Sequence, residues 1–303
     1  MDIFDLSSAA ITSILIIAGY TAIITLGQYV SMSGGSLSVA HAAMAGAAGY
    51  LGGMLTIRLN VALPVAMLAG MAFGFVLGSL LGFLSVRLHE LVAGLMTLAF
   101  AEVMVVVALN LDIIGGANGL SGVPLNTDLT AVVVTLVLVL LAVWRYDTSR
   151  LGVAARACRD DHEAAAAIGI RVTWVKSFTF GLGSAIAGLG GVLAIHYTSV
   201  QTPDDLGFFQ GLNFLIFAIF GGSYIVWGAL FGSLVLSVLP EFLRFSASDR
   251  YILYGVVLAA VVILRPEGLI RRQSFGWLRA AVQPLGRPFA RRAVIGPQGR
   301  GDP

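Results

Sequence analysis

The chain has 303 residues, of which 58% are hydrophobic and only 11% are charged, and its mean hydropathy is +0.92. No water-soluble protein of this length needs so large an apolar fraction, so the composition excludes that class and indicates an integral membrane protein. The formal net charge of +2 conceals an asymmetry, because eight arginines follow Leu264.

The apolar runs indicate helices. Only helices and closed barrels satisfy the backbone in lipid, and the runs here are continuous rather than alternating. A hydrocarbon layer of roughly 30 Å requires about 20 apolar helical residues. The sequence predicts an all-α, polytopic transmembrane bundle of about nine spans, with eight or ten as alternatives because the second and seventh are Gly-rich or short. The spans are 8–27, 36–57, 62–86, 90–109, 128–144, 175–197, 210–226, 228–243 and 250–264.

The distribution of Lys and Arg predicts the orientation, since short basic loops stay on the cytoplasmic side. Residues 145–176 carry five arginines and a lysine, whereas 110–127 and 198–209 carry neither. The first segment is expected inside and the other two outside, which gives a cytoplasmic C-terminus. We expect a permease domain at 1–270 and a basic, disordered cytoplasmic tail at 271–303.

Small residues recur at helical spacing and predict close contact between helices. This contact is either fixed packing within the subunit or a surface that slides during transport. The repeats are Gly70, Gly74, Gly78 and Gly82; Gly183, Ala187 and Gly191; and Gly228 with Gly232.

Two ionisable residues fall within predicted spans. Glu102 lies mid-span, where a charge costs about 3 kcal/mol. The functional interpretation is that it lines a pathway or carries a proton; the structural interpretation is that it bonds to a neighbouring helix. His41, among Ser, Ala and Gly, is more typical of a hydrogen bond between helices than of a ligand.

The loop Gly115–Pro124, G-G-A-N-G-L-S-G-V-P, contains four glycines that permit tight turns and could direct backbone N–H groups at a target. It lacks the phosphate-loop pattern. Neither metal-ligand spacing nor a hydrolytic Ser, His and Asp grouping occurs, so we expect no metal, no cofactor and no enzymatic activity.

A polar island lies between two predicted spans. Asp160 and Glu163 resemble a capping box, the alanines 164–167 favour a helix, and Gly169 suits its end. These residues predict a helix near 161–168. It is either a solvated connection or, as its caps and shortness favour, a docking element for a partner protein.

Three motifs in order resemble the permease subunits of branched-chain amino-acid ABC importers, and of the two permease types the chain is most similar to the M-type. The motifs are R-L-H-E-L-V-A-G-L-M-T-L-A-F-A-E followed by G-G-A-N-G-L-S-G-V-P, then L-G-V-A-A-R-A-C-R-D-D-H-E-A-A-A-A-I-G-I, and finally L-R-P-E-G-L-I. The resemblance implies a type II-like importer fold in a bacterial inner membrane. It also implies four kinds of partner: a second related permease, two cytoplasmic ATPases, a periplasmic binding protein and the bilayer, with no nucleic acid.

The resemblance also implies roles for particular residues. The ATPase-coupling segment matches Glu163, Ala164, Ala165 and Gly169, flanked by Asp161 and His162. The extracytoplasmic loop matches Gly115, Gly116, Asn118, Gly119, Leu120, Ser121, Gly122 and Pro124. An early S-x-x-H pattern matches Ser38 and His41, which with Glu102 are the candidates for the translocation pathway. The late stretch 221–228 departs from the family, with bulky residues where small ones are usual.

The predicted function is the permease subunit of an ATP-driven importer for leucine, isoleucine, valine or related small solutes. Urea, amides and aromatic acids are alternative solutes within the same family. A self-sufficient secondary transporter, with Glu102 as proton carrier, and a non-transporting membrane scaffold are the alternatives from other classes.

Overall fold

The computed structural model describes residues 8–222, 225–242 and 255. Helices coincide with the first eight predicted spans. All of the ninth span except residue 255, the boundary near residue 270 and the arginine tail lie outside the described residues. These helices are α1 (Ser8–Ser33), α2 (His41–Leu59), α3 (Leu63–Ser85), α4 (Glu90–Asn110), α5 (Leu129–Asp147), α8 (Val172–Thr198), α9 (Phe208–Gly221) and α10 (Val226–Phe242). The prediction of a helical fold is therefore confirmed.

Among the described residues, five helices are long and apolar enough to cross a membrane, namely α1, α3, α4, α5 and α8. The helices α9 and α10 are apolar but shorter. In α2, nine of 19 residues are Ala or Gly, which lowers its hydropathy without shortening it. The total of nine spans thus remains a prediction.

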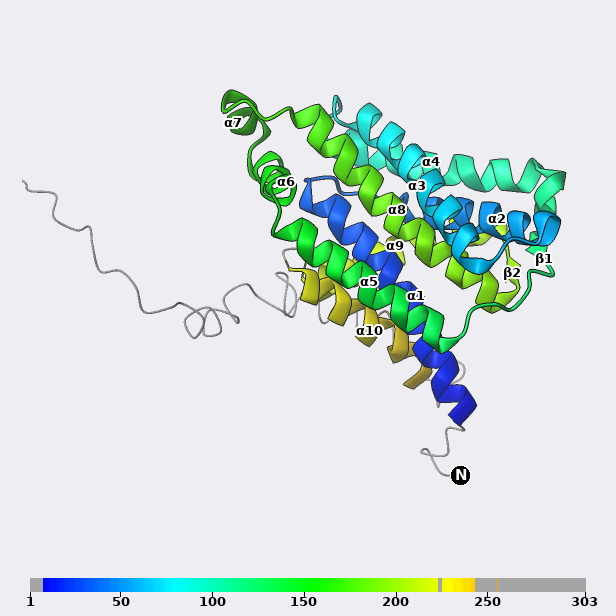
Figure 1. The fold of residues 1–303 in the computed structure, drawn as a ribbon. Coiled ribbons are helices and arrows are strands. Elements are labelled where there is room, and N and C mark those ends of the chain that lie inside the picture. The colour runs from blue at the N-terminus through cyan, green and yellow to red at the C-terminus, as the bar shows by residue number, and fades with distance from the viewer. Residues whose placement is uncertain (1–7, 223–224, 243–254, 256–303) are drawn as a thin grey trace, which may run out of the picture. The chain divides into compact units, whose positions relative to one another are not determined.

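The helices α1, α2 and α8 form the centre of the bundle, and α3, α4 and α5 lie around them (Figure 1). Within the most apolar part of each helix, 72% of the residues are buried in α8 but only 17% in α4. The outward faces carry exposed side chains such as Leu95, Val103 and Leu138. Such faces suit contact with lipid rather than water.

The glycine repeat of α3 lies against α8, as close packing requires. A Cβ atom added at Gly74 would stand 2.5 Å from the backbone oxygen of Ser184, and one at Gly82 would stand 2.8 Å from the Cβ of Phe180. No side chain fits between the two backbones. The second repeat contributes from the other side, because Gly191 of α8 meets the backbone of Ala45 in α2.

The two ends of the bundle differ in charge. We call one the basic end; its charged groups are Arg87, Arg145, Arg150, Arg156, Arg159, Arg171 and Lys176, together with the acids that pair with or flank them. The opposite, acidic end holds Asp112, Asp128, Asp204 and Asp205, and its described residues include one basic side chain, Arg58. Two 3-10 turns, η1 (Asp112–Ile114) and η2 (Gly116–Asn118), lie at the acidic end.

The connection between α8 and α9 folds back into the bundle, although the sequence predicts an external loop there. After Ser199, whose φ of 62° ends α8, strand β2 (Val200–Gln201) pairs antiparallel with β1 (Leu120–Ser121). The 3-10 turn η3 (Pro203–Leu206) follows, and Leu206 is 1% exposed in a cluster with residues of α2 and α4. The fold-back therefore places polar backbone next to the central helices.

Candidate functional site

The polar island forms two short helices at the basic end, α6 (Arg150–Asp160) and α7 (His162–Ala167), beside the start of α8 (Figure 1). The prediction that Asp160 caps the second helix is wrong. Asp160 is the last residue of α6, whereas Asp161 has the extended backbone of an N-cap, and its Oδ1 accepts from the N–H groups of Glu163 and Ala164 at 2.9 and 3.0 Å. The stop at Gly169 is present, with φ of +88°.

The end of α7 is a Schellman motif. Gly169 N–H donates to the oxygen of Ala166, and Ile170 N–H donates to the oxygen of Ala165. This pattern satisfies the last carbonyl groups of a helix and often includes an apolar contact. Here Ile170 packs against the buried cluster that contains Ala165. Both ends of this six-residue helix are thus fixed by its own sequence.

One side of α7 is buried and the other is open. Ala165 packs with Ala155 and Cys158 of α6 and Val175 of α8, and burial raises the pKa of the Cys158 thiol. The remaining residues of α7 are exposed, and Ile168 just beyond it is 76% exposed. The exposed side of α7, which includes Glu163, thus lies away from the packing of Ala165 against α6 and α8.

An ion pair that the sequence did not predict holds α6 to the bundle. The guanidinium of Arg156 pairs with the carboxylate of Asp147 at the end of α5. It also donates a hydrogen bond to the backbone oxygen of Asp147 at 2.9 Å. The hydroxyl of Tyr29 in α1 donates to the same carboxylate at 3.3 Å. The sequence did contain one indication that α6 begins here, namely Ser149. Its hydroxyl caps α6 by accepting a hydrogen bond from Gly152 N–H. The α6–α7 segment is thus connected to both α1 and α5.

Ser38 and His41 lie together in a buried polar cluster with two residues of α1. His41 Nε2 and Ser31 Oγ are 2.8 Å apart, and Gln28 Nε2 donates to the backbone oxygen of Ser38 at 2.8 Å. Ser38 Oγ accepts from the N–H of Ala40, at the start of α2. All four polar side chains are at most 1% exposed, so these hydrogen bonds fix the first turn of α2 against α1.

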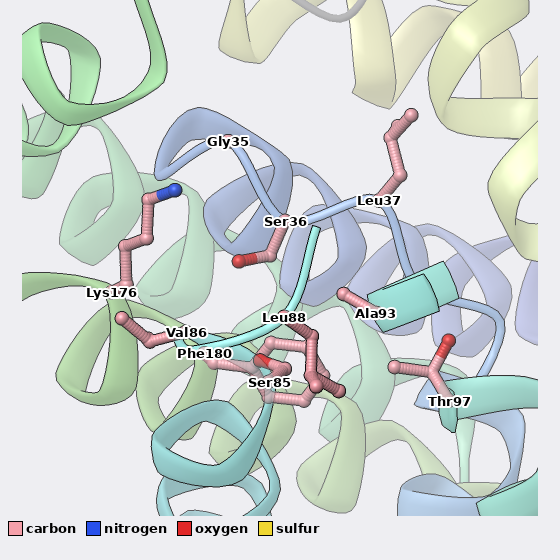
Figure 2. A pocket seen from close by; sticks show the side chains of 10 residues that line it. All are labelled: Gly35, Ser36, Leu37, Ser85, Val86, Leu88, Ala93, Thr97, Lys176 and Phe180. Atoms are coloured by element: carbon pink, nitrogen blue, oxygen red, sulfur yellow. The ribbon is translucent and has the colours of Figure 1, made fainter. Parts of the chain in front are cut away.

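A small pocket of about 40 Å³ opens next to this cluster at the basic end (Figure 2). Its walls come from the α1–α2 loop, the α3–α4 connection, α4 and α8; Figure 2 shows the polar groups of Ser36, Thr97 and Lys176 around it. Phe180 lines the pocket and also contacts His41, with ring centroids 5.2 Å apart. Phe180 therefore separates the pocket from the polar cluster.

Glu102 lies apart from that cluster, exposed on α4. Its Oε1 accepts from the N–H of Phe208, the first residue of α9, at 3.0 Å. A carboxylate at a helix N-terminus satisfies a free N–H group and interacts favourably with the helix dipole. A hydrogen bond between α4 and α9 therefore explains why a carboxylate is present at this position.

The loop Gly115–Pro124 contains the tight turns that its glycines predict, since all four have positive φ. Its N–H groups, however, bond within the chain: Gly119 N–H donates to Gly116, and Val123 N–H donates to the oxygen of Ser199. Asn118, Ser121 and Pro124 are exposed at the acidic end. In the described part of the chain, no three His, Cys, Asp or Glu residues are grouped as a metal site would require.

Comparison with known proteins decides the family. A family model described as "Branched-chain amino acid transport system / permease component" matches residues 10–264, most of the chain. The chain belongs to this permease family. Its apolar helices agree with that assignment, and the protein is a multi-pass membrane protein of a transport system.

Individual relatives include both types of permease. LivH of Salmonella typhimurium, a high-affinity branched-chain amino acid transport permease, is 32% identical over 126 residues, 41% of each chain. BraD of Pseudomonas aeruginosa is 29% identical over 161 residues, 52% of each chain. LivM of Escherichia coli K12 is 26% identical over 223 residues, 62% of this chain and 52% of LivM. The matches thus span about half of these relatives or less, and the M-type assignment stays a prediction. No solved structure matches the chain.

Proposed function

We propose that the chain is the membrane-spanning permease subunit of an ATP-driven importer for branched-chain amino acids or related small solutes. The family match over residues 10–264 carries this proposal. Relatives named as high-affinity branched-chain amino acid permeases supply the solute class. The proposed partners are a second related permease, two ATPases that hydrolyse ATP, and an extracytoplasmic binding protein.

The charge distribution supports an orientation in a bacterial inner membrane. Seven basic residues gather at the basic end and one at the acidic end of the described bundle. Because positive charge is retained on the cytoplasmic side, the basic end is assigned to the cytoplasm. The α6–α7 segment then faces the compartment that holds ATP.

The exposed side of α7 is the proposed contact for an ATPase. Its caps and the buried Ala165 keep the helix formed without a partner. The pair between Arg156 and Asp147, with Tyr29 bound to the same carboxylate, connects the segment to α5 and α1. A displacement of α7 by an ATPase would therefore act on the central helices rather than on a free loop.

The first turn of α2 is the proposed inner constriction of the pathway. Ser38 and His41 lie at this turn, and Phe180 stands between His41 and the pocket of Figure 2. A shift of α1 would reach this turn directly, because Gln28 and Ser31 hold it. Glu102 needs no place in the pathway, since its bond to Phe208 N–H explains it.

Co-purification with the ATPase tests the coupling assignment. Glu163→Arg reverses a charge on the exposed side of α7, so we expect it to reduce the amount of ATPase recovered with the tagged chain. Asp204→Arg makes the same reversal at the acidic end and should recover as much ATPase as the unaltered chain. Equal recovery from both variants would contradict the docking role of α7. Uptake that persists without ATP and disappears with the proton gradient would contradict the proposed function itself.

A further inference from the structure

A second cavity, of about 120 Å³, lies between α1, α2, α8, α9 and the fold-back before α9. It is partly open to the outside of the described bundle, since Thr198, Val200 and Asp205 of its lining are exposed. It extends from Thr198 and Gln201 near the acidic end to Ala42 in the first turn of α2. Part of its wall is apolar, with Ile24, Ile195 and Phe214 among the lining residues. It therefore ends at the proposed inner constriction, on the side away from the pocket of Figure 2.

One charged residue lines this cavity, Asp205 of η3. Its Oδ2 accepts from the N–H and the hydroxyl of Thr202, at 2.8 and 3.0 Å, which fixes the side chain. Its Oδ1 has no hydrogen-bond or ion-pair partner among the described residues. No Arg, Lys or His belongs to the described lining, so no cation of that lining offsets the carboxylate.

The neutral polar groups of the lining can donate hydrogen bonds to the carboxylate of a zwitterionic amino acid. Tyr20 and Gln210 carry donors, a phenol O–H and an amide NH₂, on α1 and α9. Both residues line the same cavity as Asp205. The lining thus combines one fixed anion, neutral donors and aliphatic or aromatic surface.

We infer that this cavity is a solute-binding subsite in which Asp205 accepts the ammonium group of a small aliphatic amino acid. Ion-assisted hydrogen bonds are about twice as strong as neutral ones, so the carboxylate favours an amine over urea or an amide. It repels a solute that carries only a carboxylate. The inference rests on the proposed function and selects, among its solutes, those with an amino group.

The chain offers a matched pair of variants. Asp205→Asn removes the charge but keeps an oxygen that can accept from Thr202, so η3 should remain folded. Asp204→Asn makes the same change one residue earlier, at a position that is exposed like Asp205 but does not line the cavity. Any difference between them reports on the cavity rather than on the net charge of the acidic end.

Ligand-induced thermal stabilisation of the purified full chain tests the inference. The probes are leucine, 3-methylbutylamine, which keeps the amine and side chain, and 4-methylpentanoate, which lacks the amine. We expect the first two to raise the melting temperature of the unaltered chain and of Asp204→Asn. In Asp205→Asn the half-maximal concentration should rise about tenfold, equivalent to about 1.4 kcal/mol. The carboxylate probe should have no effect.

Two results would overturn the inference: equal stabilisation of both variants, or no stabilisation of the unaltered chain by either amine. Leucine uptake by the assembled transporter, measured separately, tests the proposed function. Leucine uptake with no effect of Asp205→Asn on binding leaves the importer proposal standing and removes the subsite. An effect on binding without ATP-dependent uptake supports the subsite and removes the importer proposal.

Discussion

The N-cap of α7 provides the sharpest test of how the proposed coupling segment is built. Asp161 accepts hydrogen bonds from two N–H groups, at 2.9 and 3.0 Å, in a helix of only six residues. Asp161→Ala removes both bonds, and loss of an N-cap costs about 1 kcal/mol, within a range of roughly 0.5–2 kcal/mol. One kcal/mol changes the ratio of formed to frayed helix about fivefold. We therefore expect the alteration to weaken α7 without unfolding the bundle.

Hydrogen exchange of the amides in 162–167, measured on the full chain, is the direct assay, and exchange there should accelerate about fivefold. Asp160→Ala is the matched control. Its side chain is 69% exposed and pairs with Arg159 at the surface, where such pairs contribute about 0–1 kcal/mol. Exchange that rises more in Asp160→Ala than in Asp161→Ala would refute the assignment of the cap. ATPase recovery should fall in parallel with the loss of α7.

Three further predictions address the bundle. Gly74→Ala adds a methyl group against the backbone of α8 and should lower the free energy of unfolding by about 1–3 kcal/mol. Thermal unfolding in detergent measures this; Gly94→Ala, which meets no atom within 4 Å, should cause no comparable loss, and equal losses would refute the packing argument. Arg156→Leu breaks the ion pair with α5 and should increase protease sensitivity in α6 more than Arg150→Leu, which breaks no ion pair among the described residues. Equal cleavage of the two variants would contradict this role of the pair. Glu102→Gln keeps an acceptor for the first N–H of α9, so ATP-dependent uptake should persist; its loss in a folded variant would favour proton-coupled transport.

Much of the helical fold was predictable because long continuous apolar runs leave few alternatives in lipid. The short helix α7 was also predictable from its alanines and from Gly169. Its cap was assigned to the wrong aspartate because α6 was not predicted. Once α6 continues to Asp160, that residue is helical, and only Asp161, at φ −160° and ψ 109°, has the backbone of an N-cap.

The departure from the family pattern in 221–228 has a structural explanation in its described residues. Gly221 and Gly228 meet backbone to backbone where α9 and α10 cross, so the small residues remain at the contact. Trp227 is 46% exposed and stays out of it. The sequence alone could not show which residues of 221–228 lie at the contact between α9 and α10, because residue type does not reveal the direction in which each residue faces.

The fold-back before α9 was not predictable from composition, and it explains two features that the sequence presents separately. Residues 200–207 are too polar for a span, and the burial of Leu206 depends on α2 and α4, which are distant in the chain. The first N–H group of α9 has no partner within its own helix, so it needs an acceptor from elsewhere in the chain. Glu102 supplies that acceptor, so the mid-span acid and the short helix α9 form one structural unit. Non-helical backbone within a membrane bundle is tolerated where it is packed in protein or lines a cavity. The fold-back meets both conditions, since it buries Leu206 on one side and presents Asp205 to a cavity on the other.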